Sequence, residues 1–471
     1  MSNFDATIIG SGPNGLAAAI RLAEAGRKVQ VLEASQSIGG GARTTELTES
    51  GFFHDVCSAI HPMAVSSSFF QSIDLSTYGL EWIHPEAPLA HPFDNSPAAI
   101  LFRDTEATSR TLGEDGVVWK NWMDTWVPRW KGLCSDALAP IGIPKHPFWM
   151  AEFGISALQP ATMFASRNFR TAAARALFAG LAGHSVLPLD MVPSSAIGIM
   201  LGIAGHAVGW PFPKGGSQAI PNALAEYLRS LGGIIQTGVR VTDIGQLPPK
   251  CPLLFETAPA NLAEIAGDEL PTAFRKKLAT YRHGPGACKV DYALHEPIPW
   301  ADPNVKKAGT VHLGGMMEEI TKSERDCWEG IHSTSPYVLV AQQSLFDETR
   351  APKGKHTGWA YCHVPAGSTT DMTNVIENQI ERFAPGFKDT VIARHTTTAA
   401  SFETYNPNYI GGDVNGGMPT IDQLFTRPTW RTYRTPNKRI YLCSAATPPG
   451  GGIHGMCGHF AAEAVINDWR D

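Results

Sequence analysis

The pattern of apolar and polar positions near the start of the chain predicts a strand, a helix and a second strand. Residues 6–9 form one apolar run and residues 29–32 form another. Between them, Leu16, Ile20 and Ala23 recur at helical spacing, so the intervening helix has one apolar face. A strand–helix–strand unit of about thirty residues is typical of a parallel α/β sheet.

The same kind of pattern predicts further elements along the chain. Residues 220–231 predict a helix. Val290, Tyr292 and Leu294 recur at every second position and predict a strand with one buried face. Other strands are predicted over residues 233–244, 253–257, 337–343 and 359–364.

A long apolar tract occupies residues 175–214. Apart from histidine, Asp190 is the only acid or base between its two ends. Neither apolar piece reaches the roughly twenty residues that a membrane-spanning helix needs, and Pro188 and Pro193 interrupt the tract. We therefore predict buried helices that line an apolar pocket, and the alternative is shallow insertion into a membrane surface.

Length, charge and cysteine content narrow the classes of protein. With 471 residues, 43% of them hydrophobic, the chain predicts two domains. A net charge of −6 and the lack of a long basic run argue against a nucleic-acid partner. The eight cysteines form no CxxC pair and show no metal-ligand spacing, and we expect no signal peptide before the first strand. We expect a cytoplasmic protein without a metal, with peripheral membrane contact as the alternative.

The turn between the first strand and the helix carries candidate chemistry. Gly10 makes a tight turn, Gly12 lets the backbone approach a pyrophosphate, and Gly15 lets the helix pack closely on the strand. The helix N-terminus offers N–H groups to phosphate, and Glu33 offers its carboxylate to the ribose hydroxyls. The predicted dinucleotide-binding residues are Gly10, Gly12, Pro13, Asn14, Gly15, Glu33 and Ala34.

The segment after the second strand distinguishes FAD from NAD. Residues 39–45 read GGGARTT. This resembles the GGRxxT motif of the amine oxidase and phytoene desaturase group of flavoproteins, with Ala42 inserted before Arg43. The resemblance implies that Gly40, Gly41, Ala42 and Arg43 lie along the pyrophosphate and ribityl chain of FAD.

The C-terminal stretch resembles the same group. Residues 440–458 read IYLCSAATPPGGGIHGMCG, which is similar to the LYLxGxxTxPGxGIPG end of carotenoid desaturases, with His454 in place of a proline. The resemblance implies that backbone N–H groups near Gly455 and Met456 face the flavin pyrimidine. No second strand–helix–strand unit comes after this loop, so we expect no NAD(P)H site. The same resemblance places Val239 and Val241 at the adenine and adds Ala446 to the cofactor site.

Four residues are candidates for the catalytic side. Lys289 stands at the head of a predicted strand and is followed by HEPIPW. This resembles the amine-oxidase segment in which a lysine holds a water near flavin N5, and a solvated strand-end lysine is the alternative. His61 lies where the chain leads from the pyrophosphate loop toward the flavin, although an ordinary loop histidine fits equally well. The resemblance places Asp413 and His454 beside the ring. Further polar positions that could face a ligand are Gln342, Gln343, Tyr361 and His363.

The resemblance covers nearly the whole chain and implies a fold and an activity. The fold class is α/β, a discontinuous Rossmann-like FAD-binding domain with an inserted α+β substrate domain. The implied activity is FAD-dependent hydride abstraction from a C–H of a mostly apolar small molecule, which forms or moves a double bond. Oxidation of a C–N bond with oxygen as acceptor is the alternative, and a flavin-binding regulator without turnover is a third. Substrate, electron acceptor and oligomeric state stay open. The expected FAD segments are 1–77, 213–282 and 401–471, and the substrate segments are 78–212 and 283–400.

Overall fold

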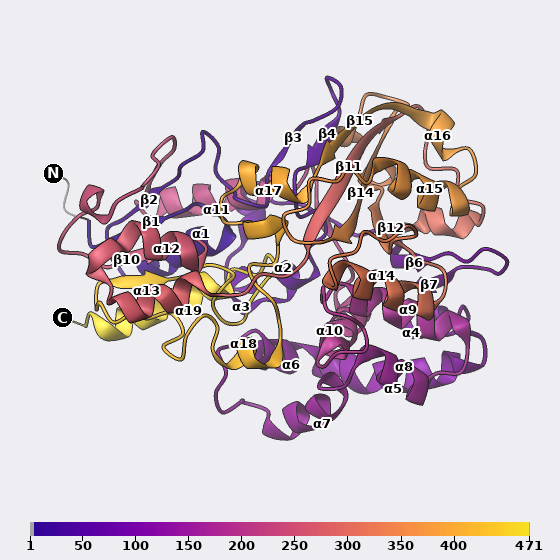
Figure 1. Cartoon of the computed structure of the whole chain (residues 1–471), viewed down its shortest axis with the longest axis horizontal. Coiled ribbons are helices and arrows are strands. Elements are labelled where there is room, and N and C mark those ends of the chain that lie inside the picture. Colours follow the sequence, from indigo (N-terminus) through magenta and orange to yellow (C-terminus); the bar gives the residue numbers. More distant parts are fainter. Residues whose placement is uncertain (1–3, 471) are drawn as a thin grey trace.

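Two sheets organise residues 4–470, which the computed structural model describes (Figure 1). The first sheet consists of β1 (Ala6–Ile9), β2 (Val29–Leu32), β9 (Ile234–Gln236), β10 (Leu253–Phe255) and β16 (Ile440–Leu442). Its strands are parallel and lie in the order β16-β10-β1-β2-β9. The start, middle and end of the chain therefore meet in one Rossmann-like sheet, at the left of Figure 1.

Three helices pack together beside this sheet. They are α1 (Pro13–Glu24), α11 (Ala219–Ser230) and α19 (Met456–Asp468), and α1 contacts both of the others. Gly458 permits the close approach of α19, because a Cβ there would lie 1.7 Å from the Asn14 carbonyl oxygen. The strands predicted at residues 6–9 and 29–32 are confirmed, and the helix predicted over residues 220–231 closely matches α11.

Two strands of this sheet are shorter than predicted. The strand expected over residues 233–244 ends at Gln236, because Gly238 takes a φ of +72°, which breaks the extended backbone. The strand expected over residues 253–257 ends at Phe255. In both cases the chain leaves the sheet at its carboxyl edge, where a parallel α/β sheet binds its ligands.

The second sheet has seven strands and lies at the upper right of Figure 1. They are β6 (Ala87–His91), β7 (Ala99–Leu101), β11 (Gly286–Leu294), β12 (Ala308–Leu313), β13 (Val338–Ala341), β14 (His356–Val364) and β15 (Val391–Thr397). Their order is β15-β11-β14-β13-β12-β6-β7. β12 and β6 pair in parallel, and the other neighbours are antiparallel. Two small sheets pair β3 (Thr44–Glu46) with β4 (Phe53–Asp55), and β5 (Trp82–Ile83) with β8 (Phe212–Pro213).

β11 is buried on both faces, whereas its alternating pattern predicted one buried face. Val290 and Tyr292 face a hydrophobic core, where Tyr292 packs edge-on against Phe387 at 5.2 Å between ring centroids. Lys289 and Asp291 lie on the opposite face and are only 1% and 0% exposed. The prediction was wrong because these polar side chains face the protein interior and not bulk solvent.

The apolar tract forms α9 (Ala172–Gly183) and α10 (Ser194–Ala207), which pack against each other and are mostly buried, as predicted. Within residues 4–470, no helix is both long and apolar enough to cross a bilayer.

The remaining helices are α2 (Pro62–Ser66), α3 (Ser68–Gln71), α4 (Thr105–Ser109), α5 (Gly116–Trp126), α6 (Trp130–Ala137), α7 (Pro147–Ala157), α8 (Ala161–Asn168), α12 (Pro259–Ala266), α13 (Thr272–Ala279), α14 (Met317–Trp328), α15 (Thr373–Phe383), α16 (Phe387–Thr390), α17 (Ala399–Tyr405) and α18 (Ile421–Phe425).

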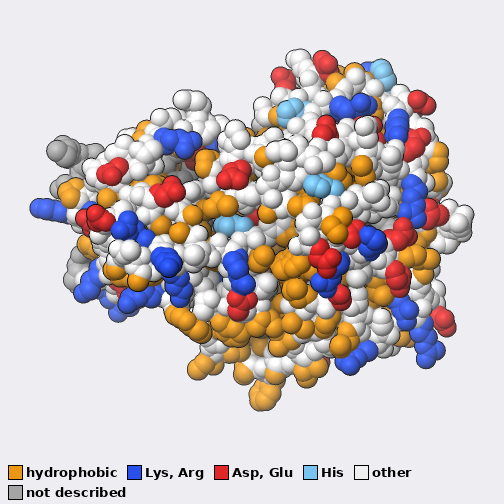
Figure 2. Space-filling model, in the orientation of Figure 1, with side chains coloured by type: hydrophobic (Ala, Val, Ile, Leu, Met, Phe, Trp, Pro, Cys, Tyr) orange, Lys and Arg blue, Asp and Glu red, His pale blue; other side chains and the backbone are white. Residues whose placement is uncertain are grey.

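Large apolar side chains gather on an exposed surface around α7, at the lower edge of Figure 2. Ile143 is 98% exposed, Phe148 87% and Ile155 74%. Because α9 and α10 are buried, this surface and not the apolar tract is the part suited to shallow membrane insertion.

In a flotation assay, we expect the protein to rise with phosphatidylcholine vesicles and a Phe148→Ser variant to rise with them to a smaller extent. If the wild-type protein stays with the lipid-free fraction, peripheral membrane contact is wrong.

Candidate functional site

A cavity of about 760 Å³ lies against the carboxyl edge of the first sheet and one face of the second. Its wall begins at the glycine turn after β1 and includes the residues that come directly after β2 and β10. It continues to side chains of β11, β12, β13 and β14. This volume lies within the range of typical ligand sites, and the cavity connects a nucleotide-binding edge to a largely apolar chamber.

The glycine turn has the geometry that its sequence predicts. Gly10 takes a φ of +106°. A Cβ on Gly15 would lie 2.3 Å from the Gly10 carbonyl oxygen, so only glycine permits this approach of α1 to β1. Glu33 braces the turn, because its carboxylate accepts the Ser11 N–H at 3.0 Å and the Ser11 hydroxyl at 2.6 Å. Arg43 lies 3.3 Å from the other carboxylate oxygen, so Glu33 and Arg43 hold each other at the cavity wall.

Glu256, which the sequence analysis missed, lies directly over this turn. It comes directly after β10, lines the cavity, and accepts the Asn14 N–H at 3.0 Å. A Cβ on Gly12 would lie 2.5 Å from Glu256 Oε1. Burial, together with the charge on Glu33, raises the pKa of Glu256 to about 8, although the N–H groups of the turn act to lower it. The position directly after a parallel strand beside β1 is the sequence signal that could have identified it.

Two buried polar atoms at this end of the cavity lack a partner among the described residues. They are Asn14 Oδ1 and Thr257 Oγ1, and both residues line the wall. A buried polar group without a hydrogen bond costs free energy, so such atoms mark a place where a ligand belongs. Together with the glycine turn and Arg43, they fit a phosphate-bearing nucleotide.

The cavity separates the predicted site residues into two groups. The wall includes Gly10, Gly12, Pro13, Asn14, Glu33, Ala34, Gly40, Gly41, Arg43, His61, Val239, Val241, Lys289 and Ala446. The residues behind the wall are Gly15, Ala42, Asp413, His454, Gly455 and Met456. The second group therefore supports the wall from behind, which differs from the direct contact expected for most of its members.

The start of α19 differs from the expectation. The Met456 N–H donates to His454 Nδ1 at 3.0 Å, so it is not free to face a flavin. His454 Nε2 consequently carries the hydrogen and lies 3.2 Å from the Gly450 carbonyl oxygen. Burial lowers the pKa of His454 to about 4, which keeps the ring neutral. A Cβ on Gly455 would lie 2.5 Å from the Phe69 ring, so Gly455 serves packing.

Asp413 is also occupied by its own loop. Its carboxylate accepts backbone N–H groups from Gly284 at 3.0 Å and from Asn415 and Gly417 at 2.8 Å each. It lies 3.2 Å from His283 Nδ1 as well. Burial acts to raise the pKa of Asp413, but His283 and these N–H groups hold it below its usual range. Asp413 therefore fixes the loop beside the cavity and does not point into it.

One face of the second sheet forms the chamber wall. Tyr361 on β14 lies between Lys289 on β11 and Leu339 on β13 in register, and Trp359 and Thr310 extend the same face. The other polar positions considered in the sequence lie behind the wall. Gln342 bonds Trp300, Gln343 bonds Asp55, and His363 bonds Glu324.

Lys289 is the fourth of nine residues in β11 and is buried, so it is neither at the strand head nor solvated. Its ammonium group pairs with Asp291 two residues along the same face. It also lies 5.9 Å from the centroid of the Trp359 ring. Burial raises the pKa of Asp291 to about 6 and Lys289 acts to lower it, so Asp291 is mainly ionised at pH 7 and balances the lysine charge.

His61 lines the cavity as a neutral ring. The Ser217 hydroxyl donates to the Ser58 carbonyl oxygen at 2.7 Å. The Ser217 hydroxyl oxygen therefore accepts the hydrogen of His61 Nε2 at 2.8 Å. His61 Nδ1 is then an unprotonated acceptor, and it has no partner among the described residues. Burial lowers the pKa of His61 to about 4. The structure thus gives this histidine a fixed tautomer, unlike an ordinary solvated loop residue.

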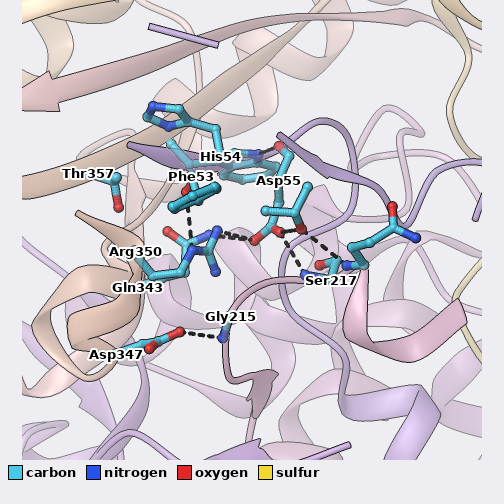
Figure 3. A network of polar contacts seen from close by, with 12 residues as sticks. Phe53, His54, Asp55, Gly215, Ser217, Gln343, Asp347, Arg350 and Thr357 are labelled. Carbon is cyan, nitrogen blue, oxygen red and sulfur yellow. Dashed lines mark hydrogen bonds and ion pairs between the residues drawn. The ribbon is translucent and has the colours of Figure 1, made fainter. Parts of the chain in front are cut away.

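A buried polar network ties the loop before His61 to the second sheet (Figure 3). The Asp55 carboxylate lies 2.8 Å from the Arg350 guanidinium, 2.8 Å from the Ser217 N–H and 3.3 Å from Gln343 Nε2. Burial acts to raise the pKa of Asp55, but Arg350 and the hydrogen-bond donors hold it below its usual value. Nearby, the Gly215 N–H donates to Asp347 at 2.8 Å. The Trp359 indole N–H donates to the Asp55 carbonyl oxygen at 3.1 Å, and this contact joins the network to β14 of the second sheet.

Known proteins show which fold this is. The NAD(P)-binding Rossmann-like domain family matches residues 8–72. The chain is 23% identical to the mouse (Mus musculus) pyridine nucleotide-disulfide oxidoreductase domain-containing protein 2, over 99% of this chain and 94% of that protein. It is 22% identical to 4,4'-diapophytoene desaturase of Staphylococcus haemolyticus, over 98% of each chain. Cyclohexylamine oxidase from Brevibacterium oxydans superposes with a TM-score of 0.62 at 15% identity, over 100% of both chains. The fold is that of the FAD-binding oxidoreductases.

The resemblance to the phytoene desaturase and amine oxidase group is therefore confirmed, and so is the α/β Rossmann-like fold class. At these identities the structural likeness shows the fold of the oxidoreductases and not a substrate. The disulfide in the name of the mouse protein has no counterpart in this chain, because its eight cysteines are free and form no CxxC pair.

Proposed function

We propose that this chain is an FAD-dependent oxidoreductase that abstracts a hydride from a C–H of a mostly apolar small molecule and so forms or moves a double bond. The continuous cavity carries the proposal. At one end it offers a glycine turn, Arg43 and unpartnered polar atoms to a dinucleotide. At the other end it offers Trp359, Tyr361 and Leu339, with Lys289 next to Tyr361 in register.

FAD, when bound, supplies the hydride acceptor. The protein itself binds the cofactor and orients the substrate. The glycine turn and Arg43 bind the pyrophosphate, and the apolar sheet face excludes water from the reacting C–H. Lys289 is fixed by Asp291 and Trp359, so its ammonium group holds a water or polarises a substrate carbonyl, which acidifies the adjacent C–H.

Oxidation of a C–N bond with oxygen as acceptor is the second candidate. It is favoured by the same Lys289 and by the Trp359 and Tyr361 rings, which pack edge-on at 5.0 Å on the cavity wall. A flavin-binding regulator without turnover is the third candidate, and it predicts a bound flavin that no substrate reduces.

Anaerobic reduction of the flavin discriminates among these candidates. We expect the purified protein to be yellow, to release FAD on denaturation, and to lose its visible absorbance with a saturated ketone or an apolar alkene. Bleaching by amines alone would favour C–N oxidation, and no bleaching by either class would favour the regulator.

NADH and NADPH should not reduce the flavin at a useful rate, because one dinucleotide motif is present and FAD fills it. Rapid stoichiometric reduction by either nucleotide would contradict this assignment.

Glu256 should make FAD binding depend on pH. When ionised, its carboxylate repels the pyrophosphate at the same N–H groups, and when protonated it does not. Because its pKa is about 8, FAD affinity should fall by up to about tenfold per pH unit above pH 8. Glu256→Gln should bind FAD with little dependence on pH, as measured by equilibrium fluorescence titration.

The matched control is Glu264→Gln, which removes an exposed carboxylate at the edge of the same cavity. It should keep the wild-type pH dependence. An identical pH profile in wild type and Glu256→Gln would show that Glu256 leaves the glycine turn when FAD binds.

A further inference from the structure

Two histidines meet in the chamber away from the glycine turn. His184, directly after α9, lines the cavity, and its Nε2 lies 2.9 Å from Nε2 of His312 on β12. His312 is fully buried. Burial lowers the pKa of His184 to about 3 and that of His312 well below its usual value, so both rings are neutral. One hydrogen is therefore shared across the pair, donated by one ring to the other.

The other nitrogen of His312 decides which ring donates. His312 Nδ1 is buried and has no partner among the described residues. An orphaned buried N–H is rarer than an orphaned acceptor, which favours an unprotonated Nδ1. His312 then carries its hydrogen on Nε2 and donates to His184 Nε2. His184 must in turn carry its own hydrogen on Nδ1, where it makes no bond to any described residue.

The cavity wall around His184 is largely apolar apart from the Thr310 hydroxyl, and His363, whose charge acts on His184, lies behind the wall and is paired with Glu324. Trp210 packs edge-on against the His184 ring at 5.6 Å, and Leu201 and Leu339 line the same cavity. The cationic side chains on the cavity wall are Arg43, Arg240 and Lys289. Arg43 and Arg240 belong to the glycine-turn end, because Arg43 pairs with Glu33 and Arg240 lies between Val239 and Val241.

The sheet register separates His184 from Lys289. His312, Leu339, Tyr361 and Lys289 lie side by side on four neighbouring strands, β12, β13, β14 and β11. Three strand spacings amount to about 14 Å, so the His184 ring, which contacts His312, is far from the lysine. An ionised carboxylate beside His184 would be buried without a counter-charge, which is costly, whereas a neutral oxygen needs only one donor.

We propose that His184 Nδ1–H binds an uncharged carbonyl-type oxygen of the substrate, at the end remote from the carbon that is oxidised near Lys289. This rests on the proposed function and adds a substrate class to it: an elongated apolar molecule with a neutral oxygen at its far end. His312 is the positioning residue, because it fixes the tautomer of His184.

Direct binding tests the proposal without turnover. The probes are a medium-chain methyl ketone, the n-alkane of equal carbon number and the matching carboxylate, titrated against tryptophan fluorescence, since Trp210 contacts His184. The wild-type protein should prefer the ketone to the alkane by roughly two- to twelvefold, the value of one neutral hydrogen bond. These titrations use the double variant Lys289→Met/Asp291→Asn as background, so that no ammonium group on the sheet face binds the ketone. His184→Leu should abolish the preference there, and His184→Asn, which keeps a donor near Nδ1, should retain it. His295→Leu, an exposed histidine, is the control.

Two outcomes would overturn the proposal. One is an unchanged ketone preference in His184→Leu. The other is tighter binding of the carboxylate than of the ketone by Lys289→Met/Asp291→Asn, which has no cation on the sheet face; this outcome holds even if His184→Leu fails to fold. FAD content is measured on the same samples. A protein without flavin would refute the proposed function while leaving the ligand preference as a separate result.

Discussion

Gly12→Val is expected to yield a protein without bound FAD. A Cβ at residue 12 would lie 2.5 Å and 2.8 Å from the two Glu256 carboxylate oxygens, in the space above the N-terminus of α1. Valine adds two further methyl groups to that Cβ, so neither the carboxylate nor a pyrophosphate can approach the turn. The ratio of flavin to protein absorbance after purification, with FAD released by denaturation, measures the effect.

The control for this prediction is the replacement of a glycine whose surroundings have space for a side chain. Gly154 lies in α7, and a Cβ there would meet no atom within 4 Å. Gly154→Ala should therefore keep normal FAD content and thermal stability. Gly12→Val that melts like the wild type and lacks FAD supports the site, whereas normal FAD content in Gly12→Val refutes it.

The glycine turn was predictable because its signal is local. Gly10 takes a positive φ and Gly15 packs against the Gly10 carbonyl oxygen, so both constraints arise within the turn, and Glu33 comes directly after the adjacent strand. Gly12 also fits the local motif, although the atoms that a Cβ there would meet belong to the distant Glu256. The strands around the turn were predicted for the same reason. The end of β9 was not predicted, because Gly238 ends the strand through its backbone conformation while the apolar pattern continues past it.

The opposite end of the cavity depends on contacts between distant segments. His184 and His312 are 128 positions apart, and no spacing rule links them. Glu256 reaches the glycine turn only because β10 lies beside β1. Lys289 was predicted to matter, but its buried pairing with Asp291 was not, since an alternating strand pattern does not reveal that both faces are covered.

The C-terminal loop shows how a motif can be correct while its chemistry changes. The glycine-rich loop precedes a helix as the resemblance implies, but the Met456 N–H donates its hydrogen bond to His454 Nδ1. A proline at that position has no side-chain acceptor, so the replacement alters which N–H groups remain free. Negative charge on a reduced flavin would then depend on other groups of the cavity, of which Lys289 is the cation on the sheet face.

Lys289→Met should slow one half-reaction by about 10²- to 10⁴-fold while FAD stays bound, because the residue lies on the chamber wall and not at the glycine turn. Stopped-flow absorbance of the flavin measures reduction by substrate and reoxidation by oxygen separately. A defect confined to reoxidation favours an oxidase. A defect confined to reduction by a ketone substrate favours desaturation, in which the ammonium group polarises the carbonyl.

The single variant also leaves Asp291 buried without its partner, and breaking a buried ion pair is itself destabilising. The matched control is the double variant Lys289→Met/Asp291→Asn, which removes both charges. If the ammonium group acts on the reacting atoms, the double variant keeps the kinetic defect while recovering thermal stability. If the double variant regains wild-type rates, the defect of the single variant came from the unpaired Asp291 carboxylate. Unchanged half-reactions in both variants would make Lys289 a structural cation and remove the main support for C–N oxidation.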